Sequence, residues 1–74
     1  MNKLDLHGVR HCDVNDIVDE FIGLHIMGRK TKEVHIITGY SERMKELVYE
    51  VLCDYKLEYH EHQYNKGLLV ISLL

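Results

Sequence analysis

The 74-residue sequence contains no proline, no tryptophan, a single phenylalanine and two cysteines. Without proline, turns must be marked by glycine and polar residues. Cys12 and Cys53 lie far apart and form no Cys-x-x-Cys pair, which favours two free thiols in a cytoplasmic protein, although one disulfide is also compatible with their number. No apolar run approaches the about 18 residues of a membrane span, and no secretory leader is recognisable, so no membrane association is expected.

An excess of positive charge is missing as well. Nine Lys and Arg residues against 12 Asp and Glu residues give a formal net charge of −3, which argues against indiscriminate nucleic-acid binding. Hydrophobic residues make up 46% of the chain and charged residues 28%, which indicates a globular rather than a disordered protein. A chain of this length buries only about 60% of its unfolded surface, so residues 1–74 are predicted to form one domain with a thin core.

The stretch Lys3–Gly8 has the alternation of a β-strand that ends abruptly at a glycine. Leu4 and Leu6 fall on one face, and Asp5 and His7 fall together on the other. A carboxylate and an imidazole therefore stand side by side at the carboxyl end of a strand, where open α/β sheets bind their ligands. An edge strand with a polar outer face explains the same alternation, so this spacing alone does not decide between a ligand site and an ordinary edge strand.

Two amphipathic helices are predicted downstream. Asp13 is the candidate N-cap of the first helix, whose apolar residues recur at helical spacing and whose C-cap is Gly28. Ser41 is the candidate cap of the second helix. Its apolar stripe is complete and consists of Met44, Leu47, Val48, Val51, Leu52 and Tyr55. The second helix is the clearest element in the sequence because it has both a cap and a full stripe.

Three further strands complete the predicted fold. Glu33–Thr38 is apolar and β-branched, which is typical of an interior strand. Leu57–His62 is polar on one side and suits a sheet edge, whereas Leu68–Leu74 is apolar on both faces and should lie inside the sheet. Residues 65–67 (Asn-Lys-Gly) predict a hairpin turn between these two strands. The result is an α/β (α+β two-layer) fold in the order β-α-β-α-β-β, with the first three strands parallel and the last antiparallel.

This topology brings three connections and both helix N-termini to the carboxyl end of the parallel strands. Free backbone amides and the positive ends of the helix dipoles make such a place suitable for an anion. Basic side chains and tyrosine rings fall in or beside these connections, namely Arg10, Arg43, Lys45 and Lys66 with Tyr40 and Tyr64. Arg29, Lys30 and Lys32 belong to the opposite end. The cluster predicts a local phosphodiester-binding patch, although ordinary surface cations explain the same residues.

Together these motifs resemble the Smr (small MutS-related) domain family. The resemblance rests on Leu-Asp-Leu-His-Gly at 4–8, an amphipathic helix, an apolar strand ending in Thr-Gly-Tyr-Ser at 38–41, and Met44-Lys45 opening the second helix. It extends from Leu4 to about Leu73. It implies a mixed four-stranded sheet of order 1-2-4-3, similar to the C-terminal domain of translation initiation factor three. It also implies an endonuclease, since family members nick DNA or cleave RNA, and some act on messenger RNA at stalled ribosomes.

The resemblance also assigns roles to residues. Asp5 and His7 map onto the first functional motif as the catalytic pair, with His7 in acid–base work and Asp5 orienting it or binding a metal. Gly39 maps onto the glycine of the second motif. Together with the residues that the topology brings to this end, the predicted nucleic-acid-binding residues are Gly8, Arg10, Thr38, Gly39, Tyr40, Ser41, Arg43, Lys45 and Lys66.

Metal dependence stays open in the sequence. Mg²⁺ and Mn²⁺ are the candidate ions, but one aspartate and one histidine are too few for a dedicated site. His60 and His62 share one face of the edge strand and could chelate a transition metal as a pair, although exposed polar positions explain them more simply. No metal ligand is therefore assigned.

The sequence departs from the family pattern at Thr38. The second motif usually reads His-Gly-x-Gly, and a threonine can hold a phosphate oxygen but is no acid or base near neutral pH. The alternative to an endonuclease acting on RNA or DNA is therefore a non-catalytic RNA- or ribosome-binding module that has lost this histidine. A third alternative is an interaction protein. The uncovered face of a two-layer fold would carry Ile37 and one apolar set from Leu68–Leu74, which allows a homodimer or another partner.

Overall fold

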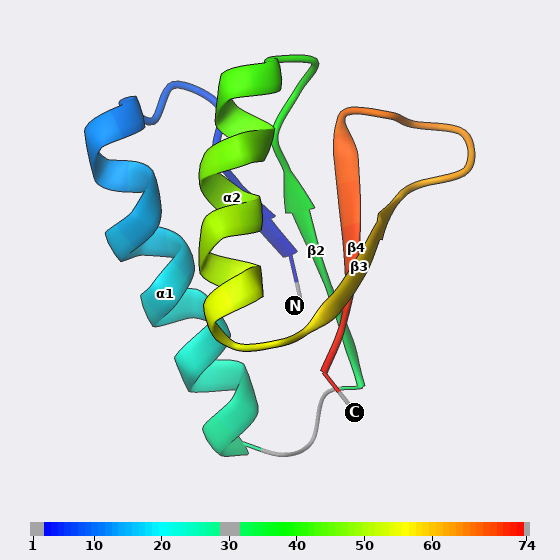
Figure 1. The fold of residues 1–74 in the computed structure, drawn as a ribbon. Helices are drawn as coiled ribbons and strands as arrows, with labels where there is room; N and C mark the ends of the chain where they lie inside the picture. The colour runs from blue at the N-terminus through cyan, green and yellow to red at the C-terminus, as the bar shows by residue number, and fades with distance from the viewer. Residues whose placement is uncertain (1–2, 29–31, 74) are drawn as a thin grey trace.

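Six elements follow one another in the predicted order in the computed structural model, which describes residues 3–28 and 32–73. They are β1 (Lys3–Asp5), α1 (His11–Gly28), β2 (Glu33–Ile37), α2 (Glu42–Asp54), β3 (Glu58–Glu61) and β4 (Leu68–Ser72). Both helices lie on the same side of the sheet, so the molecule has two layers (Figure 1). Neither described helix is long and apolar enough to cross a membrane.

The sheet has the strand order β1-β2-β4-β3, which confirms the expected 1-2-4-3 arrangement. β1 and β2 are parallel, and β4 runs antiparallel to both β2 and β3. The last strand therefore lies inside the sheet and the third lies at its edge. The polarity of the two strands explains their places, because all four residues of β3 are exposed whereas the three central residues of β4 are buried.

The core fills the space between the sheet and the helices. Alternate strand residues point toward the helices, and Val34, Ile36, Leu69 and Ile71 are completely buried there. The helices contribute Val14, Val18 and Ile22 from α1 and Met44, Leu47, Val48, Val51 and Leu52 from α2. The stripe predicted for α2 is thus confirmed, with Tyr55 half-buried at its C-cap. Each fully buried aliphatic side chain contributes about 1.5–3 kcal/mol by leaving water.

The two helix starts turned out differently. Ser41 caps α2 as predicted, because its hydroxyl accepts a hydrogen bond from the Met44 amide at 3.2 Å. The prediction that Asp13 caps α1 was wrong, since that helix begins at His11 and the Asp13 amide donates to the Arg10 carbonyl at 2.9 Å. Asp13 lies in the first turn instead, where a carboxylate also favours the helix dipole. Aspartate suits both positions, so composition alone placed the start of the helix three residues too late.

The strand ends differ from the predicted ones by a few residues. β1 ends at Asp5, although the Leu6 amide still donates to the Ile37 carbonyl at 3.0 Å. β2 ends one residue before Thr38, and β3 loses one residue at each end of its predicted range. Three residues named in the sequence predictions lie outside the described residues, namely Arg29, Lys30 and Leu74.

The other face of the sheet carries no described helix (Figure 1). The strand register places Lys3, His35, Val70 and His60 in one row across the four strands. The neighbouring row contains Asp5, Ile37 and Leu68. The predicted apolar residues of this uncovered face, Ile37 and one set from β4, are therefore confirmed, and they share the face with a candidate catalytic residue, Asp5.

Candidate functional site

Three connections meet at one end of the molecule, as the topology predicted. Figure 1 shows the turn after β1, the link from β2 to α2 and the β3–β4 connection at the end where both helices begin. Most of the candidate residues belong to these segments. The hydrogen bonds and ion pairs of these residues show which side chains face solvent and which hold the three segments together.

The two candidate catalytic residues lie where β1 passes into its turn, with Asp5 as the last residue of the strand and His7 in the turn. The Asp5 carboxylate (Oδ1) accepts a hydrogen bond from the backbone N–H of His7 at 2.9 Å, and the Val9 amide donates to the Leu6 carbonyl at 3.0 Å. Gly8 has a φ of +79° at the third position of this turn, where a positive φ favours glycine. Asp5 and His7 are both exposed. Asp5 therefore positions His7 through the backbone, and the imidazole is left open to solvent.

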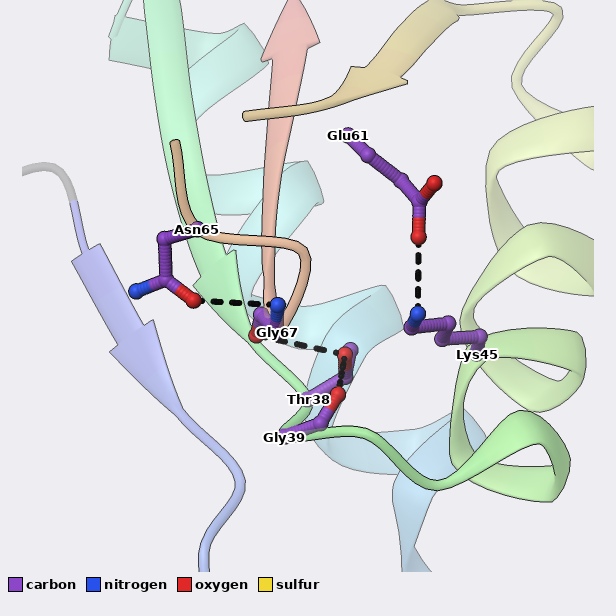
Figure 2. Close-up of polar contacts among 6 residues, drawn as sticks. All are labelled: Thr38, Gly39, Lys45, Glu61, Asn65 and Gly67. Carbon is purple, nitrogen blue, oxygen red and sulfur yellow. Dashed lines mark hydrogen bonds and ion pairs between the residues drawn. The ribbon is translucent and has the colours of Figure 1, made fainter. Parts of the chain in front are cut away.

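The end of β2 is attached to the β3–β4 connection through one carbonyl (Figure 2). The Gly67 oxygen accepts hydrogen bonds from the amides of Thr38 at 2.8 Å and Gly39 at 3.0 Å. The Thr38 hydroxyl lies 2.9 Å from the Gly39 carbonyl oxygen and 3.3 Å from that of Gly67, so its one proton serves one of them at a time. Thr38 is 7% exposed. These groups hold the connection in place, and the threonine hydroxyl faces backbone carbonyls rather than a phosphate.

The hairpin turn predicted at residues 65–67 is closed by Asn65. Its side-chain oxygen accepts from the Gly67 amide at 3.0 Å, and its carbonyl accepts from the Leu68 amide at 3.1 Å. A Cβ atom on Gly67 would lie only 3.1 Å from the Cα of Gly39 and 3.2 Å from its carbonyl carbon. The two glycines therefore approach each other so closely that a side chain on Gly67 would make a tight contact with the backbone of Gly39.

Lys45 does not extend toward a ligand. Its side chain is buried between α2 and β3, and Nζ lies 2.7 Å from the Glu61 carboxylate (Figure 2). The hydrogen bond to Glu61 raises the pKa of the Lys45 ammonium group, and the same bond lowers the pKa of the Glu61 carboxyl group. Of the four cations predicted at this end, Lys45 is the one committed to a partner inside the fold.

This ion pair predicts how stability depends on pH. The lowered Glu61 pKa stabilises the fold above the ordinary value of 4.5, and that contribution is lost as pH falls through the folded-state pKa. The raised Lys45 pKa stabilises the fold below 10.5 and ceases to do so above its folded-state pKa. Urea unfolding at a series of pH values should therefore show an acid limb, which is a fall in the free energy of unfolding toward low pH. This limb should be flatter in Glu61→Gln. Glu50→Gln, at an exposed position of α2, should leave the limb intact, and an unchanged limb in Glu61→Gln would contradict the assignment.

The remaining candidates are exposed. Arg43 lies 3.2 Å from Glu46 and Arg10 lies 3.8 Å from Asp13, and surface pairs of this kind are weak enough to be exchanged for a phosphate. Lys66 is exposed on the β3–β4 connection. The tyrosines Tyr40 and Tyr64 are exposed, and Ser41 uses its hydroxyl as the cap of α2. The solvent-facing part of the predicted patch thus consists of Arg10, Arg43 and Lys66 with the two tyrosine rings.

The described residues do not build a dedicated metal site. Within residues 3–28 and 32–73, no group of three or more His, Cys, Asp or Glu side chains is arranged to hold an ion. One oxygen of the Asp5 carboxylate is already bonded to the His7 amide. The described side chains therefore do not form a dedicated site for Mg²⁺ or Mn²⁺.

A hollow on the uncovered sheet face was not predicted from the sequence. It has a volume of about 310 Å³ and is bounded by β2, β3, β4 and the residues after β3. His35, His60 and His62 line it, with Tyr64 beside them. Histidines at alternate strand positions were visible in the sequence. Their meeting, however, depends on β4 lying between β2 and β3.

Comparison with known proteins assigns no family. No family model matches this chain, and no curated protein sequence matches it. The Smr resemblance therefore rests on the motif around Asp5 and His7 and on the order of the elements.

Proposed function

We propose that this chain is an Smr-like nucleic-acid-processing domain, a small endonuclease that cleaves phosphodiester bonds with His7 as its acid–base residue. The observation that carries the proposal is the turn after β1. There Asp5 holds the His7 backbone at 2.9 Å and leaves the imidazole exposed at the carboxyl end of a strand. Arg10, three residues further on and exposed, supplies positive charge for a phosphate.

The geometry favours RNA over DNA as the substrate. The family pattern has a second histidine, but Thr38 at that position is buried and bonded to the backbone. A single imidazole is best matched to a substrate that carries its own nucleophile, and RNA does so in its 2′-hydroxyl group. His7 takes the 2′-hydroxyl proton as that oxygen bonds to phosphorus, the bond from phosphorus to the 5′-oxygen breaks, and the leaving oxygen takes a proton from water. The products are a 2′,3′-cyclic phosphate and a 5′-hydroxyl end.

A single deoxy substitution in the substrate tests this function. A labelled RNA oligonucleotide should be cut to a product ending in a cyclic phosphate. The same oligonucleotide with one 2′-deoxynucleotide should resist cleavage at that position alone. Equal cleavage at the deoxy position would mean that water is the nucleophile. If neither substrate is cut by an excess of protein that binds it, the endonuclease proposal is wrong.

A specific observation favours a second candidate, a non-catalytic RNA- or ribosome-binding module. Residues 38 and 39 are occupied in attaching the β3–β4 connection, so the second motif has a structural role in this chain. Such a module would bind the same RNA through Arg10, Arg43 and Lys66. The deoxy-substituted and unsubstituted oligonucleotides would then bind equally, and neither would be cleaved.

Restoring the family histidine is expected to fail. Thr38→His puts a larger ring into a position that is 7% exposed, so the free energy of unfolding should fall by about 1–3 kcal/mol and cleavage should not accelerate. Thr38→Ser keeps the hydroxyl group and serves as the matched control. Urea unfolding beside a single-turnover cleavage assay measures both effects. Faster cleavage at wild-type stability would mean that the end of β2 opens to admit the ring.

A further inference from the structure

The hollow on the uncovered sheet face is built from three neighbouring strands. Val70 of β4 is paired with His35 of β2 on one side and with His60 of β3 on the other. Because neighbouring strands lie about 4.8 Å apart, the two histidine backbones are separated by about 10 Å across an apolar floor. His62 and Tyr64, which follow β3, close one side of this space. The hollow is thus apolar at its base and carries flat rings around it.

The polar groups around this floor have defined hydrogen-bonding roles. The Tyr64 amide donates to Nδ1 of His62 at 3.1 Å, so the neutral imidazole carries its proton on Nε2 and acts there as a donor rather than as a metal ligand. The Glu33 carboxylate can only accept, and one of its oxygens lies 3.3 Å from Nε2 of His35. The hollow therefore has a hydrogen-bond donor and an acceptor beside its apolar floor, an arrangement that suits a planar heterocycle with polar groups on its edge.

The charges on this face disfavour a phosphate in the hollow itself. Glu33 lines the hollow, and Glu58 lies in the same cross-strand row, since both pair with Ser72. The Tyr64 side chain is 85% exposed and is available to stack on a ring placed beside it. Stacking on aromatic side chains is the usual way in which proteins hold the bases of single strands.

We propose that the hollow binds one nucleobase of a single-stranded nucleic acid, an inference that rests on the proposed function. The base lies over Val70 and stacks on Tyr64, with its edge bonded to the His62 Nε2–H group and to Glu33. An acceptor such as Glu33 favours a base with an exocyclic amine, so cytosine should bind more tightly than uracil.

The same face connects the hollow with the proposed cleavage site. The His62 amide donates to the Leu68 carbonyl at 2.8 Å, and Leu68, Ile37 and Asp5 continue that row across the sheet. Three interstrand spacings separate the two ends of the row, which is about 14 Å. A strand that crosses the sheet would place one base in the hollow and a phosphodiester group of a nearby nucleotide beside Asp5 and His7.

Nuclear magnetic resonance of the isotope-labelled chain tests the inference. Cytidine and uridine monophosphates are titrated first, and then oligocytidine and oligouridine of six nucleotides. Oligocytidine should shift the signals of His35, His60 and Tyr64 and bind more tightly than oligouridine. If the free monophosphate bound as tightly as the oligonucleotide, the proposal that the hollow binds a base of a single strand would be wrong. If the ligand shifted only the signals of the turn after β1, the hollow would not be the base site. If dilution of the protein without ligand shifted the signals of the uncovered face, that face would bind a second copy of the chain, and the inference would also be wrong.

Variants of exposed residues keep the test free of folding defects. Tyr64→Ala should weaken oligocytidine binding by about 5- to 150-fold, the usual effect of losing one base–aromatic stack, whereas Tyr64→Phe keeps the ring and should bind like wild type. His60→Ala should weaken binding, and His11→Ala, at the start of α1, should not. Equal affinities for Tyr64→Ala and wild type would contradict the inference. Cleavage is assayed separately, so base binding without cleavage would refute the endonuclease and leave this inference standing.

Discussion

Replacing His7 by alanine is expected to lower the single-turnover rate of RNA cleavage by about 10²–10⁴-fold, the usual contribution of one acid–base group. The affinity for uncleaved RNA should change little, because Arg10 and its neighbours are the groups proposed to hold the phosphate. The exposed imidazole has no hydrogen-bond partner within the described part of the chain, so its loss should leave the free energy of unfolding unchanged. Single-turnover rates measured beside a binding titration separate these quantities.

Two controls locate the effect at the imidazole. Asp5→Asn keeps an oxygen that can accept the His7 N–H bond and should retain most of the activity, whereas Asp5→Ala releases the turn and should lose more. His11→Ala removes another exposed histidine at the same end of the molecule. If His11→Ala lost as much activity as His7→Ala, the proton carrier could no longer be assigned to His7 alone.

Replacing Gly67 by alanine is expected to lower the free energy of unfolding by about 1–3 kcal/mol, the usual cost of an added methyl group in a packed site. The new Cβ atom would meet the backbone of Gly39 at 3.1 and 3.2 Å, and backbone atoms cannot move aside as a side chain can. The carbonyl that binds the Thr38 and Gly39 amides would be pushed away. Urea unfolding measures the loss, and hydrogen exchange of those two amides should become faster.

Gly28→Ala is the matched control for this prediction. Gly28 is the last residue of α1, and nothing lies within 4 Å of a Cβ atom built there. Alanine favours helical backbone over glycine by about 0.5–1 kcal/mol, so this variant should be as stable as wild type or slightly more stable. An equal loss of stability in both variants would mean that the contact between Gly39 and Gly67 is not its cause.

Burial patterns made most of the fold predictable from the sequence. The polar pattern of β3 and the apolar pattern of β4 predicted that the third strand lies at the edge of the sheet and the last strand inside it, and the observed order agrees. The inward orientation of Thr38 could have been found as well. It continues the alternation that puts Val34 and Ile36 in the core.

The remaining features of the site depend on contacts between distant residues. Lys45 flanks the apolar stripe of α2, and only the position of β3 reveals that Glu61, 16 residues later, neutralises it. His35 and His60 line the same hollow because β4 lies between β2 and β3, so that both residues pair with Val70. Periodicity along the chain describes which face a residue occupies. It does not describe which strand lies next to it.

The interior position of β4 also affects how the chain can acquire its structure during synthesis. β3 pairs with β4 and with no other strand of the described sheet, so a nascent chain that ends before residue 68 has nothing for β3 to join. Until then Val34 and Ile36 lack their neighbours Leu69 and Ile71, and one side of β2 remains unpaired. Such an intermediate exposes both a strand edge and apolar side chains, the features that chaperones recognise and that cause aggregation.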